Sequence, residues 1–206
     1  MSDFMSYDPW RGVKTRNGIQ SDLVISALQK SIRRGLAEEA ATSAYEMYIT
    51  SPQLEEKLWR RLQAISVEDV GFGDLSAPVL IHTLNQMRQN FPYTDGDRPI
   101  FFVHAIRYLA AAKKDRTSDN LKNIIITEFE YGRTPEIPDF ALDMHTEQGR
   151  AMGRDFKHFL QEGSRVENEL TVDENYKARL LALLDKIEAE QPEPVAQPFP
   201  FNTWQS

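Results

Sequence analysis

The chain has 206 residues, of which 41% are hydrophobic and 27% charged, a composition typical of a globular protein. Its net charge of −7 argues against a protein that coats nucleic acid nonspecifically, because phosphate repels an acidic surface. The absence of cysteine excludes disulfides and thiolate metal sites. No apolar run approaches the ~20 residues of a membrane span, and the segment 1–8 is acidic where a secretory signal would be basic. We therefore expect a cytoplasmic location and no membrane partner.

Helical periodicity dominates the first third of the chain. One helix is predicted between Asp22 and Arg34, with Gly35 as its stop, and a second from about residue 37 to 49. Ser51 followed by Pro52 is typical of an N-cap and a first helical residue, so a third helix begins there. The apolar faces that we expect are Ile25, Leu28 and Ile32 in the first helix and Leu58, Leu62 and Ile65 in the third.

Similar start and stop signals continue along the chain. Helices are predicted to open at residues 76–78, at residues 97–99 and at Thr117 or Ser118, the last of them ending at Gly132, and a final long helix covers residues 173–190. The apolar faces that we expect are Leu80, Leu84 and Met87; Ile100, Val103, Ile106 and the alanines from Ala105 to Ala112; Leu121, Ile125 and Phe129; and Tyr176, Leu180, Leu183, Leu184 and Ile187. The fold class is therefore all-α, as one compact multi-helix domain.

The expected domain organisation has three parts. Residues 1–17 form a leader, residues 18–190 a helical domain, and residues 191–206 a proline-rich extended tail. Prolines and glycines interrupt the helical pattern near 132–155, where the helical domain divides if it consists of two lobes.

Motifs of catalysis are missing from the chain. No Gly-x-x-x-x-Gly-Lys-Ser/Thr loop is present to hold nucleotide phosphates, and no serine or cysteine nucleophile signature occurs. No two of the four histidines, His82, His104, His145 and His158, have the spacing of a helix-borne metal pair. We expect no cofactor, no metal and no ATP hydrolysis.

Two groups of polar residues stand out. Glu68, Asp69, Gly71 and Asp74 follow the third helix, and short acidic residues with glycines are typical of a hydrogen-bonded corner. Catalysis or magnesium binding by the acid pair is the alternative to this structural role.

Basic residues provide the second group. The anion- or nucleic-acid-binding candidates are Lys30, Arg33, Arg34, His145, Arg150 and Arg154. Two further basic groups, Arg60–Arg61 and Lys113–Arg116, would extend a phosphate track if they converged on the same surface. Pairing of Arg150 and Arg154 with internal acids such as Asp139 or Asp143 is the alternative interpretation.

Three blocks of sequence resemble the C-terminal helical region of the replication-associated recombination protein A family, the clamp-loader-like AAA+ ATPases of DNA repair. The blocks are Leu23 to Gly35, Leu58 to Asp74 and Ala105 to Asn120, within a likeness that covers roughly residues 18 to 163. Gly73 and Leu75 stand where the family usually has alanine and proline, and the ATPase module is missing. The chain therefore resembles a stand-alone relative of the oligomerisation domain or a fragment of a longer ATPase; Met1 and the leader favour the former.

The resemblance implies a helical collar that assembles into homotetramers. We therefore expect a non-catalytic oligomerisation or adaptor protein of DNA replication and repair, a tetramer or otherwise a dimer, with the face from Ala105 to Ala112 suited to contact between copies. A separate AAA+ ATPase and DNA are further partners that this interpretation implies. A nucleic-acid-binding module is the first alternative, and a metal-dependent hydrolase of phosphorylated substrates around His145, Glu68 and Asp69 is the second.

Overall fold

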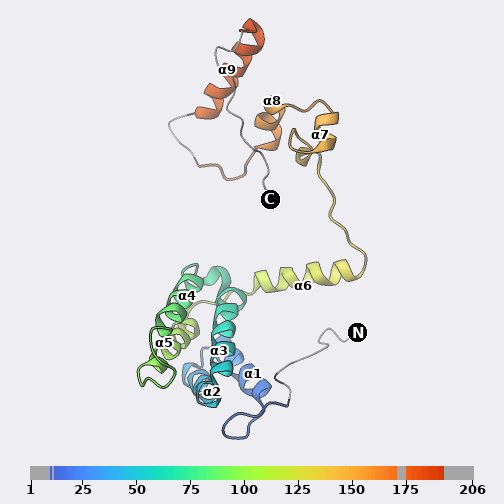
Figure 1. Cartoon of the computed structure of the whole chain (residues 1–206). Coiled ribbons are helices and arrows are strands. Elements are labelled where there is room, and N and C mark those ends of the chain that lie inside the picture. Colours follow the sequence, from blue (N-terminus) through green and yellow to red (C-terminus); the bar gives the residue numbers. More distant parts are fainter. Residues whose placement is uncertain (1–9, 11, 171–174, 193–206) are drawn as a thin grey trace. The chain divides into compact units, whose positions relative to one another are not determined.

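The computed structural model describes residues 10, 12–170 and 175–192, which form helices joined by turns and loops (Figure 1). Within these residues the only β pairing is an isolated antiparallel bridge between Lys14 and Gln20. The predicted all-α fold class is confirmed. The chain divides into two compact units, Met1–Arg133 (unit 1) and Thr134–Ser206 (unit 2).

Unit 1 carries the long helices whose start signals are visible in the sequence. Their bounds are α1 Ser21–Arg33, α2 Ala37–Thr50, α3 Pro52–Ile65, α4 Ala77–Arg88, α5 Arg98–Ala111 and α6 Thr117–Glu130. Ser51 caps α3 as predicted, because its Oγ accepts a hydrogen bond from the amide of Leu54 at 3.2 Å. A π-helical turn, η1 (Ser66–Val70), and a 3-10 turn, η2 (Gly71–Gly73), connect α3 to α4.

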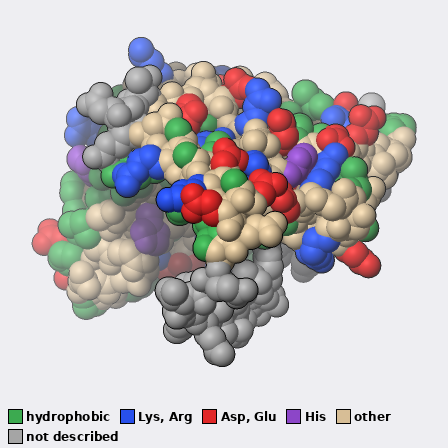
Figure 2. Space-filling model, turned by 90° about the horizontal axis from the view of Figure 1, so that it is seen from above, with side chains coloured by type: hydrophobic (Ala, Val, Ile, Leu, Met, Phe, Trp, Pro, Cys, Tyr) green, Lys and Arg blue, Asp and Glu red, His purple; other side chains and the backbone are tan. Residues whose placement is uncertain are grey.

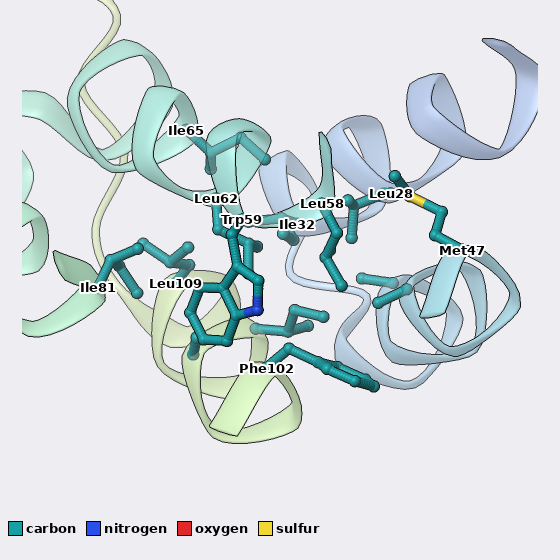
Figure 3. Packing of buried hydrophobic residues seen from close by; sticks show 14 of the residues in the cluster. Leu28, Ile32, Met47, Leu58, Trp59, Leu62, Ile65, Ile81, Phe102 and Leu109 are labelled. Carbon is teal, nitrogen blue, oxygen red and sulfur yellow. The ribbon is translucent and has the colours of Figure 1, made fainter. Parts of the chain in front are cut away.

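The hydrophobic core of unit 1 lies among α1 to α5. Its largest buried side chain is Trp59 of α3, which is 1% exposed. The residues labelled in Figure 3 come from all five helices and meet around α3: Leu28, Ile32, Met47, Leu58, Trp59, Leu62, Ile65, Ile81, Phe102 and Leu109. The stripes predicted for α1 and α3 are therefore largely the ones that the fold buries.

Two predicted helix faces were wrong in part. In α4, Met87 is 45% exposed whereas Ile81 is fully buried, and in α5, Ile100 is 59% exposed whereas Phe102 is fully buried. Alpha-helical spacing predicts a helix better than it predicts which side faces the core, since both helices carry apolar residues around much of their circumference.

The alanines of α5 were expected at a contact between copies. Ala105 is fully buried and Ala110 is 7% exposed, because α5 packs against α2 and α4 of the same unit. Ala105 and Ala110 are therefore used in close packing within the unit and are not open to another copy, whereas Ala111 is exposed.

A buried charge network joins α3, α4 and α5. Glu55, which is 1% exposed, accepts hydrogen bonds from Arg98 Nε at 2.8 Å and Nη2 at 2.9 Å, and its Oε2 lies 3.2 Å from Arg88 Nη1. Arg88 also contacts Glu56 at 2.5 Å and lies over the Trp59 ring, 5.6 Å from its centroid. The charges are paired, which is the condition for burying them.

Unit 2 consists of short helical pieces and one longer helix. Its elements are η3 Asp139–Ala141, α7 Glu147–Ala151, α8 Phe156–His158, η4 Phe159–Gly163 and α9 Tyr176–Glu190. The last predicted helix is present from Tyr176, and residues 171–174 before it lie outside the described residues. Residues 1–9 and 11 of the predicted leader and residues 193–206 of the predicted tail also lie outside them.

The inward face predicted for α9 was wrong. Tyr176 is 62%, Leu183 54% and Ile187 46% exposed, and α9 has no buried residue. Within the described residues, α9 therefore does not contribute a buried face to a core.

We expect Glu55→Gln to lower the free energy of unfolding by about 3–5 kcal/mol, because it leaves Arg88 and Arg98 buried without their shared carboxylate. Urea unfolding followed by circular dichroism measures the change. The matched control is Glu39→Gln at an exposed position of α2, which should stay within about 0.5 kcal/mol of the wild type. Equal stability of both variants would contradict a role for the network.

Candidate interaction surface

The residues Ser66–Asp74, which we call the corner, are organised around the carboxylate of Asp69. The Asp69 side chain is fully buried, and it accepts hydrogen bonds from Arg33 Nε at 2.7 Å, from Gln29 Nε2 at 3.1 Å and from Arg116 Nη1. These donors come from α1 and from the loop before α6. One carboxylate therefore ties three segments of unit 1 together.

Glu68 adds a second acceptor to the corner. It accepts a hydrogen bond from Gln29 at 2.8 Å and lies 3.5 Å from Arg33, 3.6 Å from Arg61 and 3.5 Å from Arg116. One arginine from each of the three basic groups in the sequence thus converges here. They converge on two carboxylates, however, and their charge is largely neutralised within the chain.

Close backbone contact between the corner and the loop 112–116 depends on two glycines. The amide of Asp115 donates to the carbonyls of Asp69 at 3.0 Å and Val70 at 3.2 Å. A Cβ at Gly71, whose φ is +51°, would lie 2.5 Å from the Asp115 carbonyl oxygen, and a Cβ at Gly73 would lie 2.4 Å from that of Lys113. Any side chain at these positions would force the loop away.

Acidic residues complete the base of α6. Asp115 accepts hydrogen bonds from the Thr117 amide and hydroxyl, both at 3.0 Å, and these lower the pKa of Asp115. Asp119 binds Lys122 at 2.7 Å and also Arg116, so the pKa of Asp119 is lowered, chiefly by the Lys122 hydrogen bond. Arg116 therefore bridges Asp69 of the corner to Asp119 of α6.

The other end of the corner is fixed to α5. Asp74 accepts hydrogen bonds from the Ser76 hydroxyl at 2.6 Å and from the hydroxyl of Tyr108, and these bonds lower the pKa of Asp74. Lys114 donates to the carbonyls of Leu109 at 2.8 Å and Ala110 at 3.0 Å, at the C-terminal end of α5, and its burial lowers its pKa.

Helix α6 presents an uncovered apolar face. Its only buried residue is Asp119. The face, which we call the α6 stripe, consists of Leu121 (57% exposed), Ile124 (52%), Ile125 (43%) and Phe129 (52%). These positions follow the spacing of one helix side. In Figure 1, α6 runs away from the other five helices of unit 1, so the stripe stays uncovered within that unit.

A second apolar area lies beside the base of α6. This corner patch consists of Val67 (52% exposed), Phe72 (73%), Leu75 (74%) and Val79 (69%). Two shallow hollows of about 300 Å³ and 190 Å³ both include Val67 and Ser118 in their walls. Leu121 and Ile125 follow Ser118 by three and seven residues on the same side of α6, so the stripe and the patch adjoin.

The remaining candidates in unit 1 do not form a compact anion site. Lys30 Nζ donates to Ser26 Oγ at 2.8 Å, and Arg34 Nη1 donates to the Lys30 carbonyl at 3.2 Å. Lys30 lines a hollow of about 310 Å³ together with Lys57 and Arg61, whereas Arg33 turns to Asp69 instead. The trio Lys30, Arg33 and Arg34 is thus split between different surroundings.

The candidates in unit 2 are engaged with their own loop. Arg154 forms a forked pair with Asp139 at 2.7 and 2.8 Å and donates to the carbonyl of Leu142 at 2.7 Å. Arg150 donates to the carbonyl of Met144 at 2.9 Å, and His145 Nδ1 lies 3.1 Å from Asp143. These contacts give both arginines and the histidine a role in holding the loop.

Backbone packs closely at Gly149, one of the two glycines beside these arginines, whereas the space around Gly153 is open. A Cβ at Gly149 would lie 2.0 Å from the Asp143 carbonyl oxygen, so this glycine serves contact within the loop. Glycines beside arginines therefore indicate a tight internal turn here as readily as an approach path for a ligand.

The described part of the chain contains neither a metal-binding cluster nor a membrane-spanning helix. In that part, no cluster of three or more histidine, aspartate or glutamate side chains is placed to hold a metal ion. In the same residues, no helix combines the length and the apolar character needed to cross a bilayer. Glu68 and Asp69, the acid pair of the hydrolase alternative, are occupied by arginines and Gln29.

The sequence was compared with protein-family models and with curated proteins, and neither comparison gave a match. The resemblance to the recombination protein A family therefore rests on the residues themselves. Most of its second block, Leu58 to Asp74, forms α3 and the corner, and its third block, Ala105 to Asn120, runs from α5 to the start of α6. The second and third blocks thus include the segments that join α6 to the core, and the first block, Leu23 to Gly35, covers most of α1.

We expect Gly73→Ala to destabilise unit 1 by about 1–3 kcal/mol, because its Cβ would meet the Lys113 carbonyl oxygen at 2.4 Å. Gly96→Ala is the matched control, since a Cβ there has no atom within 4 Å. Thermal unfolding measures stability, and hydrogen exchange of the α6 amides reports whether the base of the helix has loosened. A Gly73→Ala variant as stable as Gly96→Ala would contradict the tight corner.

Proposed function

We propose that this chain is a non-catalytic, all-helical adaptor that assembles with itself through the α6 stripe and the corner patch. The observation that carries the proposal is the exposed face of α6: four large apolar side chains, each at least 43% exposed, on a helix with no buried apolar residue. Contiguous apolar surface of this kind marks interaction sites in proteins, whereas singly scattered apolar residues do not.

The energetics of an uncovered helix point the same way. Helices of about 12–15 residues are marginal in water unless an apolar face is packed, and α6 has 14 residues. Burying the stripe against a partner removes apolar area from water at about 25 cal/mol per Å². Assembly through α6 would therefore stabilise the helix as well as the complex.

The proposed setting is DNA replication and repair, beside a separate AAA+ ATPase, with a tetramer or a dimer as the assembled state. This part rests on the resemblance of the corner and the neighbouring blocks to the recombination protein A family. Pairing of arginines with internal carboxylates supports an adaptor over a nucleic-acid-binding module, because paired charges attract phosphate weakly. Figure 2 shows basic and acidic side chains interspersed on the face that it presents.

We expect the full chain to be oligomeric at micromolar concentration and Ile125→Glu to dissociate it. A charge in the middle of the stripe opposes burial, and the fold should survive because Ile125 is 43% exposed in the single chain. Light scattering coupled to size exclusion measures the mass. Asn123→Glu, on the opposite side of α6, is the matched control and should keep the wild-type mass. A wild-type chain that is monomeric throughout would remove the proposal.

The nucleic-acid alternative makes a separate prediction. We expect the wild-type chain to show no tight binding to a labelled single-stranded oligonucleotide, measured by fluorescence anisotropy. A phosphate-binding module would instead bind with an affinity that falls steeply between about 50 and 200 mM salt. Binding of that kind, weakened by Lys30→Ala or Arg34→Ala without loss of melting temperature, would favour the alternative function.

A further inference from the structure

A third uncovered apolar surface of unit 1, besides the α6 stripe and the corner patch, is a groove between α1 and α2. The groove has a volume of about 560 Å³ and is lined by Asn17, Ile19, Leu23, Val24, Ala27, Thr42, Ser43, Tyr45, Glu46 and Ile49. Ile19 is 44%, Leu23 59% and Tyr45 52% exposed. Large apolar side chains along the walls of the groove are thus exposed to solvent.

The polar atoms of the groove are already engaged within the chain. The carboxylate of Glu46 accepts hydrogen bonds from the amide of Asn17 at 3.0 Å and from its side chain at 2.6 Å. Hydrogen bonds to Thr15 and Asn17 lower the pKa of Glu46, so that it is ionised and satisfied. The groove therefore has no unmet demand for a cation or a polar ligand, and its open surface fits an apolar partner.

The shape of the groove suits a helix. Helix-in-groove recognition uses anchors at i, i+3, i+4 and i+7 of an amphipathic helix. Ala27, Thr42 and Ser43 are small, and small residues in a groove let a helix backbone approach closely. The α6 stripe carries Leu121, Ile124, Ile125 and Phe129 with that spacing, so the chain contains both halves of such a contact.

We infer that the α6 stripe of one copy docks in the α1–α2 groove of another copy. The inference rests on the proposed self-assembly and names the surface that receives α6. A single contact of this kind covers the α6 stripe and the groove together, whereas pairing of α6 with α6 would leave the groove open. The contact joins two different surfaces and is therefore heterologous. Repeated from copy to copy it builds a closed ring if the rotation between neighbours adds up to a full turn, and two copies form a dimer if each docks its α6 in the groove of the other.

Charge at the ends of the two surfaces agrees with this pairing. The turn 14–20 beside the groove carries Lys14 and Arg16 and no acidic residue. The last turn of α6 carries Glu128 and Glu130, of which Glu128 pairs with Arg133. Opposite charges at a rim favour encounter in the productive orientation.

The α6 of the same copy does not fill the groove. Its base is fixed at the corner, which contacts the C-terminal end of α1 through Arg33, whereas the groove lies along the N-terminal half of α1 around Leu23. Leu23 and Tyr45 stay more than half exposed. An α6 stripe in the groove therefore has to come from another copy of the chain.

Mixing of two defective variants tests the inference. Ile125→Glu disables the stripe and keeps the groove, and Leu23→Glu disables the groove and keeps the stripe. Each is expected to be monomeric by itself at micromolar concentration. Because the mixture retains one intact stripe and one intact groove, equal amounts should form a 1:1 heterodimer, measured by light scattering. His104→Glu, at an exposed position of α5, and Asn123→Glu are the matched controls and should each assemble as the wild type does.

The outcomes separate this inference from the proposed function. An oligomeric Ile125→Glu variant would sink the self-assembly through α6 and the groove contact with it. A monomeric Ile125→Glu variant beside an oligomeric Leu23→Glu variant would keep assembly through α6 but overturn the groove. Two monomeric variants that stay monomeric when mixed would also overturn it. That result would mean that the stripe of one copy does not bind the groove of another. Circular dichroism of each variant establishes that it is folded.

Discussion

The buried carboxylate of Asp69 determines where α6 stands. Helix α6 has no buried apolar residue, so hydrophobic packing does not hold it to the other helices of unit 1. Its position depends instead on polar contacts at its base: Arg116 joins Asp69 to Asp119, and the Asp115 amide donates to the Asp69 carbonyl. Burying Asp69 is costly unless its oxygens are paired, and Arg33 and Gln29 provide that pairing from α1.

The glycines of the corner and this carboxylate act on the same joint. Gly71 and Gly73 let the loop 112–116 approach the corner, and the loop brings Arg116 within reach of Asp69. The joint leaves Leu121, Ile125 and Phe129 exposed beyond it. The proposed self-assembly uses this helix, which is fixed at its base and uncovered along its length, and the inferred receiving surface is the groove between α1 and α2.

Internal pairing engages many of the arginines in the described part of the chain. Arg33, Arg61 and Arg116 meet at Glu68 and Asp69, Arg88 and Arg98 share the buried Glu55, and Arg154 forks onto Asp139. In each case a planar guanidinium pairs with a carboxylate, and Arg98 and Arg154 also donate to backbone carbonyls. These arginines thus join helices and loops within each unit.

The sequence by itself determined the helices of unit 1, because caps, prolines and apolar spacing are local signals: Ser51 with Pro52 and the stripe of Leu28 and Ile32 were visible without the fold. It also indicated a polar corner at Glu68 and Asp69. Only the tertiary structure decided what these residues face. The partners of Asp69, Arg33 and Arg116, are 36 and 47 residues away along the chain, and no local pattern encodes such a distance. Apolar spacing marked a face on both α5 and α6, yet Ala105 is buried and Leu121 is exposed, because α2 and α4 cover α5 whereas α6 leaves the bundle at the corner.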